Sequence, residues 1–399
     1  MTKIRRGLRL SLNITALVLC VIALFATIWI IIPAPFFEIW LISVLSSEWS
    51  FGFGALAFVG LVLSLSLRVY GKSKLFPLSL ILGGLAILIS FYPLVSVWNV
   101  AGDEKVELSF AQYAKGFWSD SNFAFAAKPE HKTYTYAEFE GEQLRLDAYL
   151  PDEKDANGAG VIVVHGGSWR GGAKSDFPAW NRWLTKQGYA VFDIDYRLTQ
   201  PNWQTATGDV KCAVIWVKQN AAKFGVSPEK LVLLGRSAGA HLALLAAYTE
   251  NDSDFVSSCP NGQFDSNVKA VISFYAPTDL FWDYNNPSNE RVLNGPVTLE
   301  NFLGGSPYQS SEIRERYAKA SPVSHVSAQT PPTLLFHGGK DQLVFEQNLI
   351  FLDKRLKDEN VRHKSIVIGY AQHGFDFNFN GWGAQIARGV MLDFLHQNS

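Results

Sequence analysis

The strongest constraint on the fold is the stretch Leu231 to Ala246, which reads LVLLGRSAGAHLALLA. An apolar run of Leu and Val leads into Gly235-Arg236-Ser237-Ala238-Gly239, and a helical pattern follows. This order predicts a strand, a sharp turn and a helix, the context in which the serine of a G-x-S-x-G motif stands exposed at the end of a sheet. The glycines suit a turn too tight for side chains. Ser237 is therefore a candidate nucleophile, and the alternative is an ordinary turn serine.

Short apolar runs on either side of this stretch predict a sheet. Residues 133–141 and 143–150 alternate polar and apolar side chains, which predicts an antiparallel pair at a sheet edge. Further strands are expected at 161–165, 191–196, 231–235, 270–275, 333–337 and 364–368, and helices at 178–187, 208–224, 238–248, 343–358 and 384–397. This alternation predicts an α/β domain, a mostly parallel sheet with helices on both faces. The segment 281–329, rich in Asn, Pro, Gly and Ser, breaks the alternation and is expected to form a lid.

A serine nucleophile needs a base and an acid that orients the base, and two later strand ends offer them. Asp341 lies in a turn after one predicted strand, and His373 lies in a glycine-flanked loop after the last. The order Ser237, Asp341, His373 is the one expected after a G-x-S-x-G turn. The alternative acids are Asp376 and Glu346, and the alternative bases are His325, His337 and His363.

The motif His165-Gly166-Gly167-Ser168-Trp169 follows the predicted strand at 161–164. Two successive glycines let the backbone approach a substrate carbonyl closely. The N–H groups of Gly166, Gly167 and Ala238 are therefore the expected oxyanion hole. His165 is expected to be structural, and an ordinary glycine turn is the alternative.

Residues from about Thr133 to the C-terminus resemble the α/β-hydrolase superfamily, specifically carboxylesterases and lipases with an HGG motif. The resembling stretches are VHGGSW, DIDYRL, GRSAGAHLA and LLFHGGKDQLV, with HGF around His373. They are similar to feruloyl, acetylxylan and bacterial carboxylesterases, and the SAGAH arrangement with membrane spans is similar to isoprenylcysteine methylesterases. The resemblance implies hydrolysis of carboxylic esters through an acyl-serine intermediate, with no metal or organic cofactor. The chain departs from the family pattern at Arg236 and in the lid.

The first hundred residues are overwhelmingly apolar, unlike the rest of the chain. Residues 10–32 carry no charge and are long enough to cross about 30 Å of hydrocarbon, whereas a signal peptide would have a shorter core and a small-residue cleavage site. Further runs cover about 51–69 and 75–98. We expect a transmembrane region at 1–100, a connector at 101–132 and the catalytic domain at 133–399. Residues 39–45 are also apolar, which leaves an interfacial helix or a longer second span open.

The charges around these runs predict an orientation. Basic residues precede the first run, a basic loop at 68–74 separates the second and third, and the loop at 33–50 contains Glu38 and Glu48 but no Lys or Arg. The positive-inside rule then puts the N-terminus in the cytoplasm and the catalytic domain on the other side of the bilayer. The expected setting is the periplasm or the exterior if the source is bacterial. The connector carries aromatic residues expected to pack on the catalytic domain, with contact with the membrane surface as the alternative, namely Phe110, Tyr113, Phe117, Trp118, Phe123 and Phe125.

The formal net charge of −1 gives no reason to expect a nucleic-acid partner. The expected partners are a small or lipophilic ester and the lipid bilayer. The 3 cysteines lack metal-ligand spacing, and Cys212 and Cys259 can pair if the domain is exported, although two free thiols fit equally well. Other functions compatible with the motifs are acyl transfer, peptide hydrolysis and ligand binding without catalysis on a hydrolase scaffold.

Overall fold

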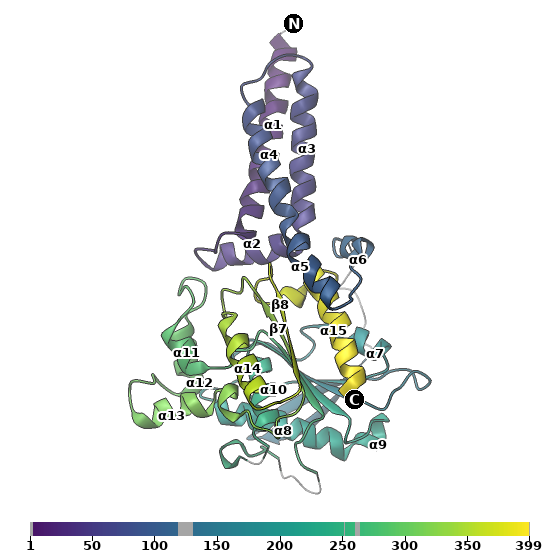
Figure 1. Cartoon of the computed structure of the whole chain (residues 1–399), viewed down its shortest axis with the longest axis vertical. Helices are drawn as coiled ribbons and strands as arrows, with labels where there is room; N and C mark the ends of the chain where they lie inside the picture. Colours follow the sequence, from purple (N-terminus) through teal and green to yellow (C-terminus); the bar gives the residue numbers. More distant parts are fainter. Residues whose placement is uncertain (1–2, 119–130, 251, 260–263, 399) are drawn as a thin grey trace.

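A slender bundle of helices stands on an α/β domain in the computed structural model, which describes residues 3–118, 131–250, 252–259 and 264–398 (Figure 1). The bundle consists of α1 (Lys3–Thr27), α3 (Ser50–Arg68) and α4 (Phe76–Ser90), and the short helix η1 (Ile28–Ile30) follows α1. Within the described ranges, 3 helices are long and apolar enough to cross a membrane, over Gly7–Ile30, Ser50–Arg68 and Phe76–Asp103.

Small residues line the contacts inside the bundle. Ala23, Ala57 and Ala86 are fully buried together, and a Cβ on Gly60 would lie 2.8 Å from the Cys20 sulfur. Larger apolar side chains point outward and are exposed along all three helices. Helices that associate in lipid show this arrangement, because small residues allow close backbone approach while the apolar exterior contacts acyl chains.

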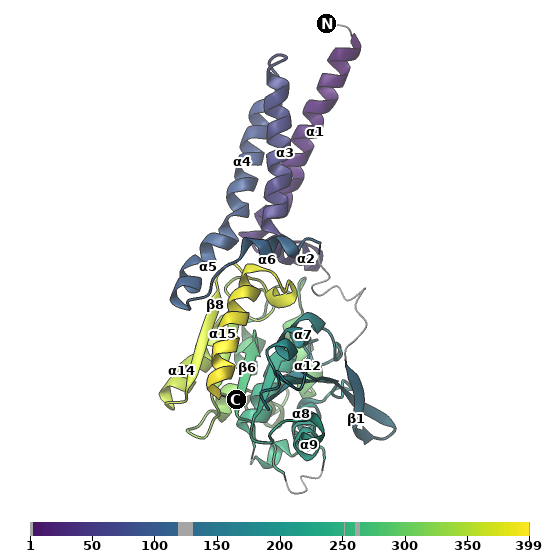
Figure 2. The same ribbon diagram turned by 90° about the vertical axis from the view of Figure 1, so that its right-hand side faces the viewer.

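Three helices join the bundle to the α/β domain: α2 (Phe37–Glu48), α5 (Tyr92–Asp103) and α6 (Phe110–Lys115). α2 is separate from α3 and lies across the foot of the bundle (Figures 1 and 2). α6 packs on the α/β domain as expected, since Tyr113 stacks on Trp382 with ring centroids 4.3 Å apart. Trp118 is exposed instead, and Phe123 and Phe125 lie outside the described residues.

Among the described residues, one sheet of 8 strands has the order β1-β2-β4-β3-β5-β6-β7-β8. β1 and β2 are antiparallel at its edge, as predicted, and β2 is antiparallel to β4, whereas the remaining neighbours are parallel. The predicted α/β class is therefore confirmed. The strands are β1 (Lys132–Phe139), β2 (Glu142–Tyr149), β3 (Gly160–Val164), β4 (Ala190–Ile194), β5 (Leu231–Arg236), β6 (Ala270–Phe274), β7 (Thr333–Gly338) and β8 (His363–Ile368).

Helices cover both faces of this sheet, because alternate strand residues enter two separate cores. Ile162 and Leu233 pack with α8 and α10 on one face, whereas Val163 and Leu234 pack with α7 and α15 on the other. The helices of the domain are α7 (Pro178–Lys186), α8 (Trp203–Gln219), α9 (Ala221–Phe224), α10 (Ala238–Tyr248), α11 (Leu280–Asn285), α12 (Gly295–Leu303), α13 (Ser311–Lys319), α14 (Gln347–Asp358) and α15 (Trp382–Asn398), with the short helices η2 (Ser253–Phe255), η3 (Pro322–His325) and η4 (Phe375–Phe377).

Three predicted helix starts are wrong, and among them α15 begins at Trp382 rather than at 384. α8 begins at Trp203 rather than at 208, because its first turn buries Trp203 and Ala206 in the core. α14 begins at Gln347 rather than at 343, because the preceding residues form a turn around a carboxylate, described below. The segment 281–329 folds as α11, α12, α13 and η3.

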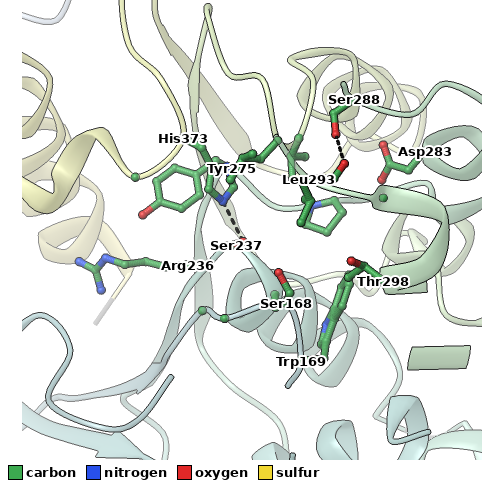
Figure 3. Close-up of a pocket in the computed structure, with 18 of the residues that line it drawn as sticks. Ser168, Trp169, Arg236, Ser237, Tyr275, Asp283, Ser288, Leu293, Thr298 and His373 are labelled. Carbon is green, nitrogen blue, oxygen red and sulfur yellow. Dashed lines mark hydrogen bonds between the residues drawn. The ribbon is translucent and has the colours of Figure 1, made fainter. Parts of the chain in front are cut away.

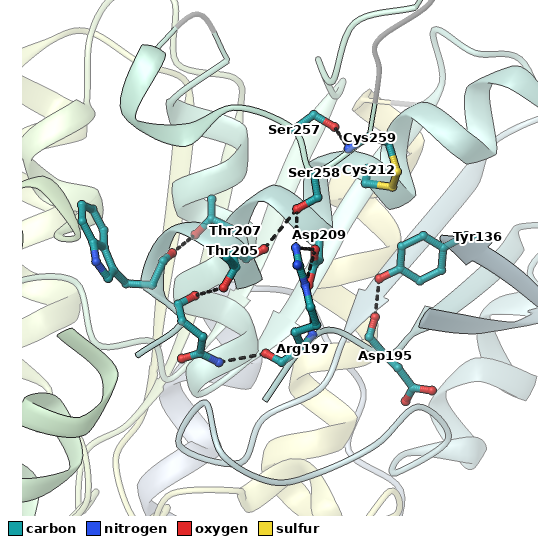
Figure 4. A network of polar contacts seen from close by, with 12 residues as sticks. Tyr136, Asp195, Arg197, Thr205, Thr207, Asp209, Cys212, Ser257, Ser258 and Cys259 are labelled. Carbon is teal, nitrogen blue, oxygen red and sulfur yellow. Dashed lines mark hydrogen bonds and ion pairs between the residues drawn. A yellow bond between two sulfur atoms is a disulfide. The ribbon is translucent and has the colours of Figure 1, made fainter. Parts of the chain in front are cut away.

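A disulfide joins Cys212 in α8 to Cys259, 47 positions later (Figure 4). Beside it, Arg197 forms an ion pair with the buried carboxylate of Asp209 and donates a hydrogen bond to Ser258 Oγ at 2.8 Å. Of the two possibilities left open by the sequence, the cysteines are therefore paired. The disulfide attaches the 258–259 segment to α8, and the hydrogen bond from Arg197 attaches it to the chain before α8.

Candidate active site

Ser237 forms the turn between β5 and α10. Its backbone has φ +54° and ψ −123°, a conformation that costs energy for any residue with a side chain. A Cβ on Gly235 would lie 2.3 Å from Gly239 O, and one on Gly239 would lie 2.2 Å from His165 O. Both positions thus exclude side chains, and the serine is held at the tip of the turn by the packing around it.

His373 connects Ser237 to Asp341. Its Nε2 lies 2.8 Å from Ser237 Oγ, and its Nδ1 lies 2.7 Å from Asp341 Oδ2. The other carboxylate oxygen of Asp341 accepts hydrogen bonds from the backbone N–H groups of Leu343 and Val344, at 2.8 and 3.0 Å. The three side chains come from the carboxyl ends of β5, β7 and β8, so the parallel sheet brings together residues that are distant in sequence.

The alternative residues have other partners. Asp376 binds Arg236 and Tyr275. The ring nitrogens of His325, His337 and His363 lie within 2.9 Å of backbone carbonyls, those of Lys319, Val344 and Val361 respectively. His337 Nε2 is also 3.6 Å from Asp341 Oδ2, but burial lowers the pKa of His337. His337 is therefore a buried neutral support for the Asp341 turn.

The loop that carries Gly166 and Gly167 has a constrained backbone. Gly167 has φ +117°, and a Cβ there would lie 2.1 Å from Gly171 O. Trp169 has φ +58°, and its indole donates a hydrogen bond to His241 Nδ1 at 3.2 Å. His165 Nδ1 donates to Gly166 O at 2.7 Å, and its ring stacks on Tyr196, which agrees with a structural role.

A cavity of about 320 Å³ opens in front of these groups (Figure 3). Gly166, Gly167 and Ala238 line it together with Ser237 and His373. The rest of its wall is largely apolar and includes Trp169, Phe177, Leu293, Leu299, Val344 and Phe345. The segment expected to be a lid therefore contributes one wall, through α11, α12 and the residues between them.

Asp283, on α11, is a carboxyl in this apolar wall (Figure 3). One oxygen accepts a hydrogen bond from Asn348 Nδ2 at 2.7 Å, while the other is buried without a partner among the described residues. Asn348 is itself fixed, because its carbonyl accepts the backbone N–H groups of Thr278 and Asp279. Burial raises the pKa of Asp283 to about 7, so its protonation changes near neutral pH.

Behind Ser237, the side chain of Arg236 is buried and points away from the serine (Figure 3). Arg236 Nε lies 2.6 Å from Asp376 Oδ2, and Tyr275 donates to the other oxygen of that carboxylate at 2.6 Å. The Tyr275 ring in turn packs on His373, with centroids 4.4 Å apart. Sequence reasoning missed this network, although the large cation in the variable position of the G-x-S-x-G motif was a signal for a buried anion nearby.

Comparison with known proteins finds relatives that are named as esterases. The BD-FAE family model matches residues 146–356. The esterase LipC of Mycobacterium tuberculosis is 29% identical over 260 residues, covering 63% of this chain and 62% of LipC. The probable carboxylic ester hydrolase LipM of the same organism is 31% identical over 248 residues, covering 61% of this chain and 55% of LipM. The chain thus spans less than two thirds of each relative.

Among solved structures, the butyrate-bound esterase 2 of Thermogutta terrifontis superimposes with a TM-score of 0.54 at 25% identity. The match covers 67% of this chain and 94% of that esterase. The α/β part of the chain therefore accounts for nearly the whole of a solved esterase, and the helical bundle is additional to it.

Proposed function

The chain belongs to the BD-FAE family of α/β-hydrolases, and from this we propose that it is a membrane-anchored serine hydrolase that cleaves carboxylic esters. The observation that carries the proposal is the pair of hydrogen bonds linking Ser237, His373 and Asp341 at the mouth of an apolar cavity. Within the enzyme class, the ester-hydrolase names of LipC and LipM favour an ester over a peptide substrate.

In the first half-reaction, Ser237 Oγ attacks the ester carbonyl carbon while His373 Nε2 takes its proton. The carbonyl oxygen becomes an oxyanion, and the N–H groups of Gly166, Gly167 and Ala238 stabilise it. Asp341 holds His373 in the tautomer that is protonated at Nδ1, and it stabilises the imidazolium that forms when His373 takes the serine proton. The bond from carbon to the alcohol oxygen then breaks, His373 returns the proton to that oxygen, and an acyl-serine remains.

In the second half-reaction, water takes the place of the alcohol. His373 Nε2 removes a proton from the water as its oxygen attacks the acyl carbon. The bond from carbon to Ser237 Oγ breaks, the serine recovers its proton, and the carboxylic acid leaves. An alcohol entering instead of water would give acyl transfer, so the products distinguish hydrolysis from transfer.

Three apolar helices and the charge pattern around them support a membrane anchor with the catalytic domain outside the cytoplasm. The Cys212–Cys259 disulfide supports the same orientation, because disulfides persist in oxidising compartments and are rare in the cytosol.

The test uses a fluorophosphonate probe and p-nitrophenyl butyrate on the full-length chain. Ser237→Ala should abolish labelling and lower kcat by roughly 10⁴-fold or more, and His373→Ala should lower kcat comparably because the three groups act as a unit. Ser311→Ala, at an exposed position on α13, is the matched control, and it should retain both labelling by the probe and hydrolysis of the ester. Equal labelling of wild type and Ser237→Ala would reject the proposal.

A further inference from the structure

α2 exposes several large apolar side chains and buries its serines, although Glu38 in its first turn is also exposed and Ile39 is buried. Phe37, Leu41 and Leu45 recur every fourth position along one face and are 45, 43 and 43% exposed. Ser43 and Ser47 on the other side are buried. A helix on a water-facing surface shows the reverse pattern, so the exposed face of α2 is suited to an apolar neighbour.

The position of α2 identifies that neighbour. α2 lies between the three apolar helices and the sheet, and α3 enters the bundle directly after it (Figures 1 and 2). It therefore lies at the level where the spans leave the bilayer. A helix there buries an apolar face at the boundary between lipid headgroups and acyl chains.

The loop before α2 and the first residue of α2 form hydrogen bonds with residues that lie next to both walls of the cavity. Ala34 N donates to Gln342 Oε1 at 3.0 Å, and Gln342 lies between Asp341 and the wall residue Leu343. On the lid side, Asn289 Nδ2 donates to Pro35 O at 2.9 Å, and Phe37 N donates to Arg291 O at 3.0 Å. Asn289 and Arg291 lie between Ser288 and Leu293, which both line the cavity.

The other end of α2 is bonded to the loop of His373. Tyr370 donates to Glu48 Oε1 at 3.0 Å, and Asn378 Nδ2 donates to Glu48 O at 3.3 Å. The carboxyl edge of the sheet, which bears Ser237, Asp341 and His373, is thus attached to α2 at several points. That edge faces the bundle side of the domain (Figure 1).

From these contacts we propose that α2 lies in the bilayer surface and that the cavity receives its substrate there. The substrate class is a water-insoluble ester whose apolar part resides in the outer leaflet. Such an ester would reach the apolar cavity along the boundary between α2 and the lid. It would not have to dissolve in water first, and the transfer of its apolar part from lipid into water is strongly unfavourable. This inference rests on the proposed esterase function and narrows its substrate.

The test compares two esters on the full-length chain in phosphatidylcholine vesicles. p-Nitrophenyl butyrate is offered in solution, and p-nitrophenyl palmitate is incorporated in the bilayer. The readout is the ratio of the two rates, so a partly inactive preparation does not alter it. Leu41→Ser/Leu45→Ser should lower the palmitate-to-butyrate ratio by about tenfold, because two side chains lose their burial in lipid. Asn289→Ala removes the hydrogen bond to Pro35 O in the loop before α2, and it should also lower the palmitate-to-butyrate ratio.

Ile350→Ser is the control, because Ile350 is similarly exposed, at 46%, on α14 rather than on α2, and its ratio should equal that of wild type. A dye attached at Leu41→Cys should show a blue-shifted emission in vesicles, whereas the same dye at Ile350→Cys should not. A palmitate-to-butyrate ratio equal to that of wild type in both Leu41→Ser/Leu45→Ser and Asn289→Ala would overturn the inference, and so would equal emission at the two labelled positions. If butyrate is still hydrolysed in that case, the esterase function is not affected. Failure of wild type on both esters would instead reject the esterase function.

Discussion

Arg236 Nε lies 2.6 Å from Asp376 Oδ2, and this buried ion pair joins the residue before Ser237 to the loop that carries His373. Phe177 and Phe274 flank the guanidinium, with ring centroids 4.2 and 5.2 Å away. The carboxylate also holds Tyr275, whose ring supports His373. The pair therefore fixes the separation of two loops on which the proposed proton transfer depends.

Asp376→Asn is expected to leave the Arg236 charge buried and incompletely paired. Removing one partner of a buried pair typically costs about 3–5 kcal/mol, so the melting temperature should fall clearly. We expect kcat to fall while KM changes little, and the pH profile of kcat to shift, because Asp376 acts on the position of His373. Thermal unfolding and ester kinetics measure these effects.

Asp358→Asn is the matched control, because Asp358 pairs with Lys354 in an exposed i,i+4 pair. Exposed pairs contribute little, so stability and kinetics should match wild type. An Asp376→Asn variant that is as stable and as active as this control would contradict a positioning role.

Asp283 and Asp193 should contribute stability that is lost between acid and neutral pH. Burial raises the pKa of Asp283 and of Asp193 to about 7, whereas an unfolded aspartate titrates at about 3.9. The folded chain therefore binds more protons than the unfolded chain between these values, and its free energy of unfolding falls as pH rises through that window. The melting temperatures of Asp283→Asn and Asp193→Asn, each taken relative to wild type, should therefore rise between pH 5 and pH 8. A difference from wild type that stays constant with pH in both variants would show that neither group titrates in this way.

The Cys212–Cys259 disulfide should stabilise the catalytic domain. For a separation of 47 residues, the loop-entropy estimate is about 4 kcal/mol. Dithiothreitol should lower the melting temperature of the wild type but not that of Cys212→Ala/Cys259→Ala, which already lacks the bond. Equal sensitivity of the two proteins to the reductant would mean that the bond does not contribute.

The orientation is tested by fusing alkaline phosphatase, which is active only after export, to two positions in a bacterial host. A fusion at the C-terminus should be active if the catalytic domain is outside the cytoplasm. A fusion after Lys72, in the basic loop between the second and third apolar runs, should be inactive. The reverse pattern would invert the proposed orientation.

Much of the fold could be predicted because the signals are local. Alternation identified the antiparallel β1–β2 pair at the sheet edge, and short apolar runs identified the parallel strands. The glycines around Ser237 identified the tight turn, because the limit at Gly235 comes from the turn itself, whereas the limit at Gly239 comes from the backbone of His165 and only the fold shows it. The catalytic roles of Ser237, Asp341 and His373 stay predictions, although the structure brings the three side chains together.

The sequence by itself determined which segments form strands, turns and apolar helices, because these depend on residues close together in the chain. Only the tertiary structure decided which carboxylate faces His373, since Asp341 and Asp376 both follow parallel strands and differ in what surrounds them. It also decided that Cys212 and Cys259 pair, and that α2 contacts the segment 281–329 and the His373 loop. These relationships join residues far apart in sequence, and their energies arise from burial and contact geometry that no local pattern contains.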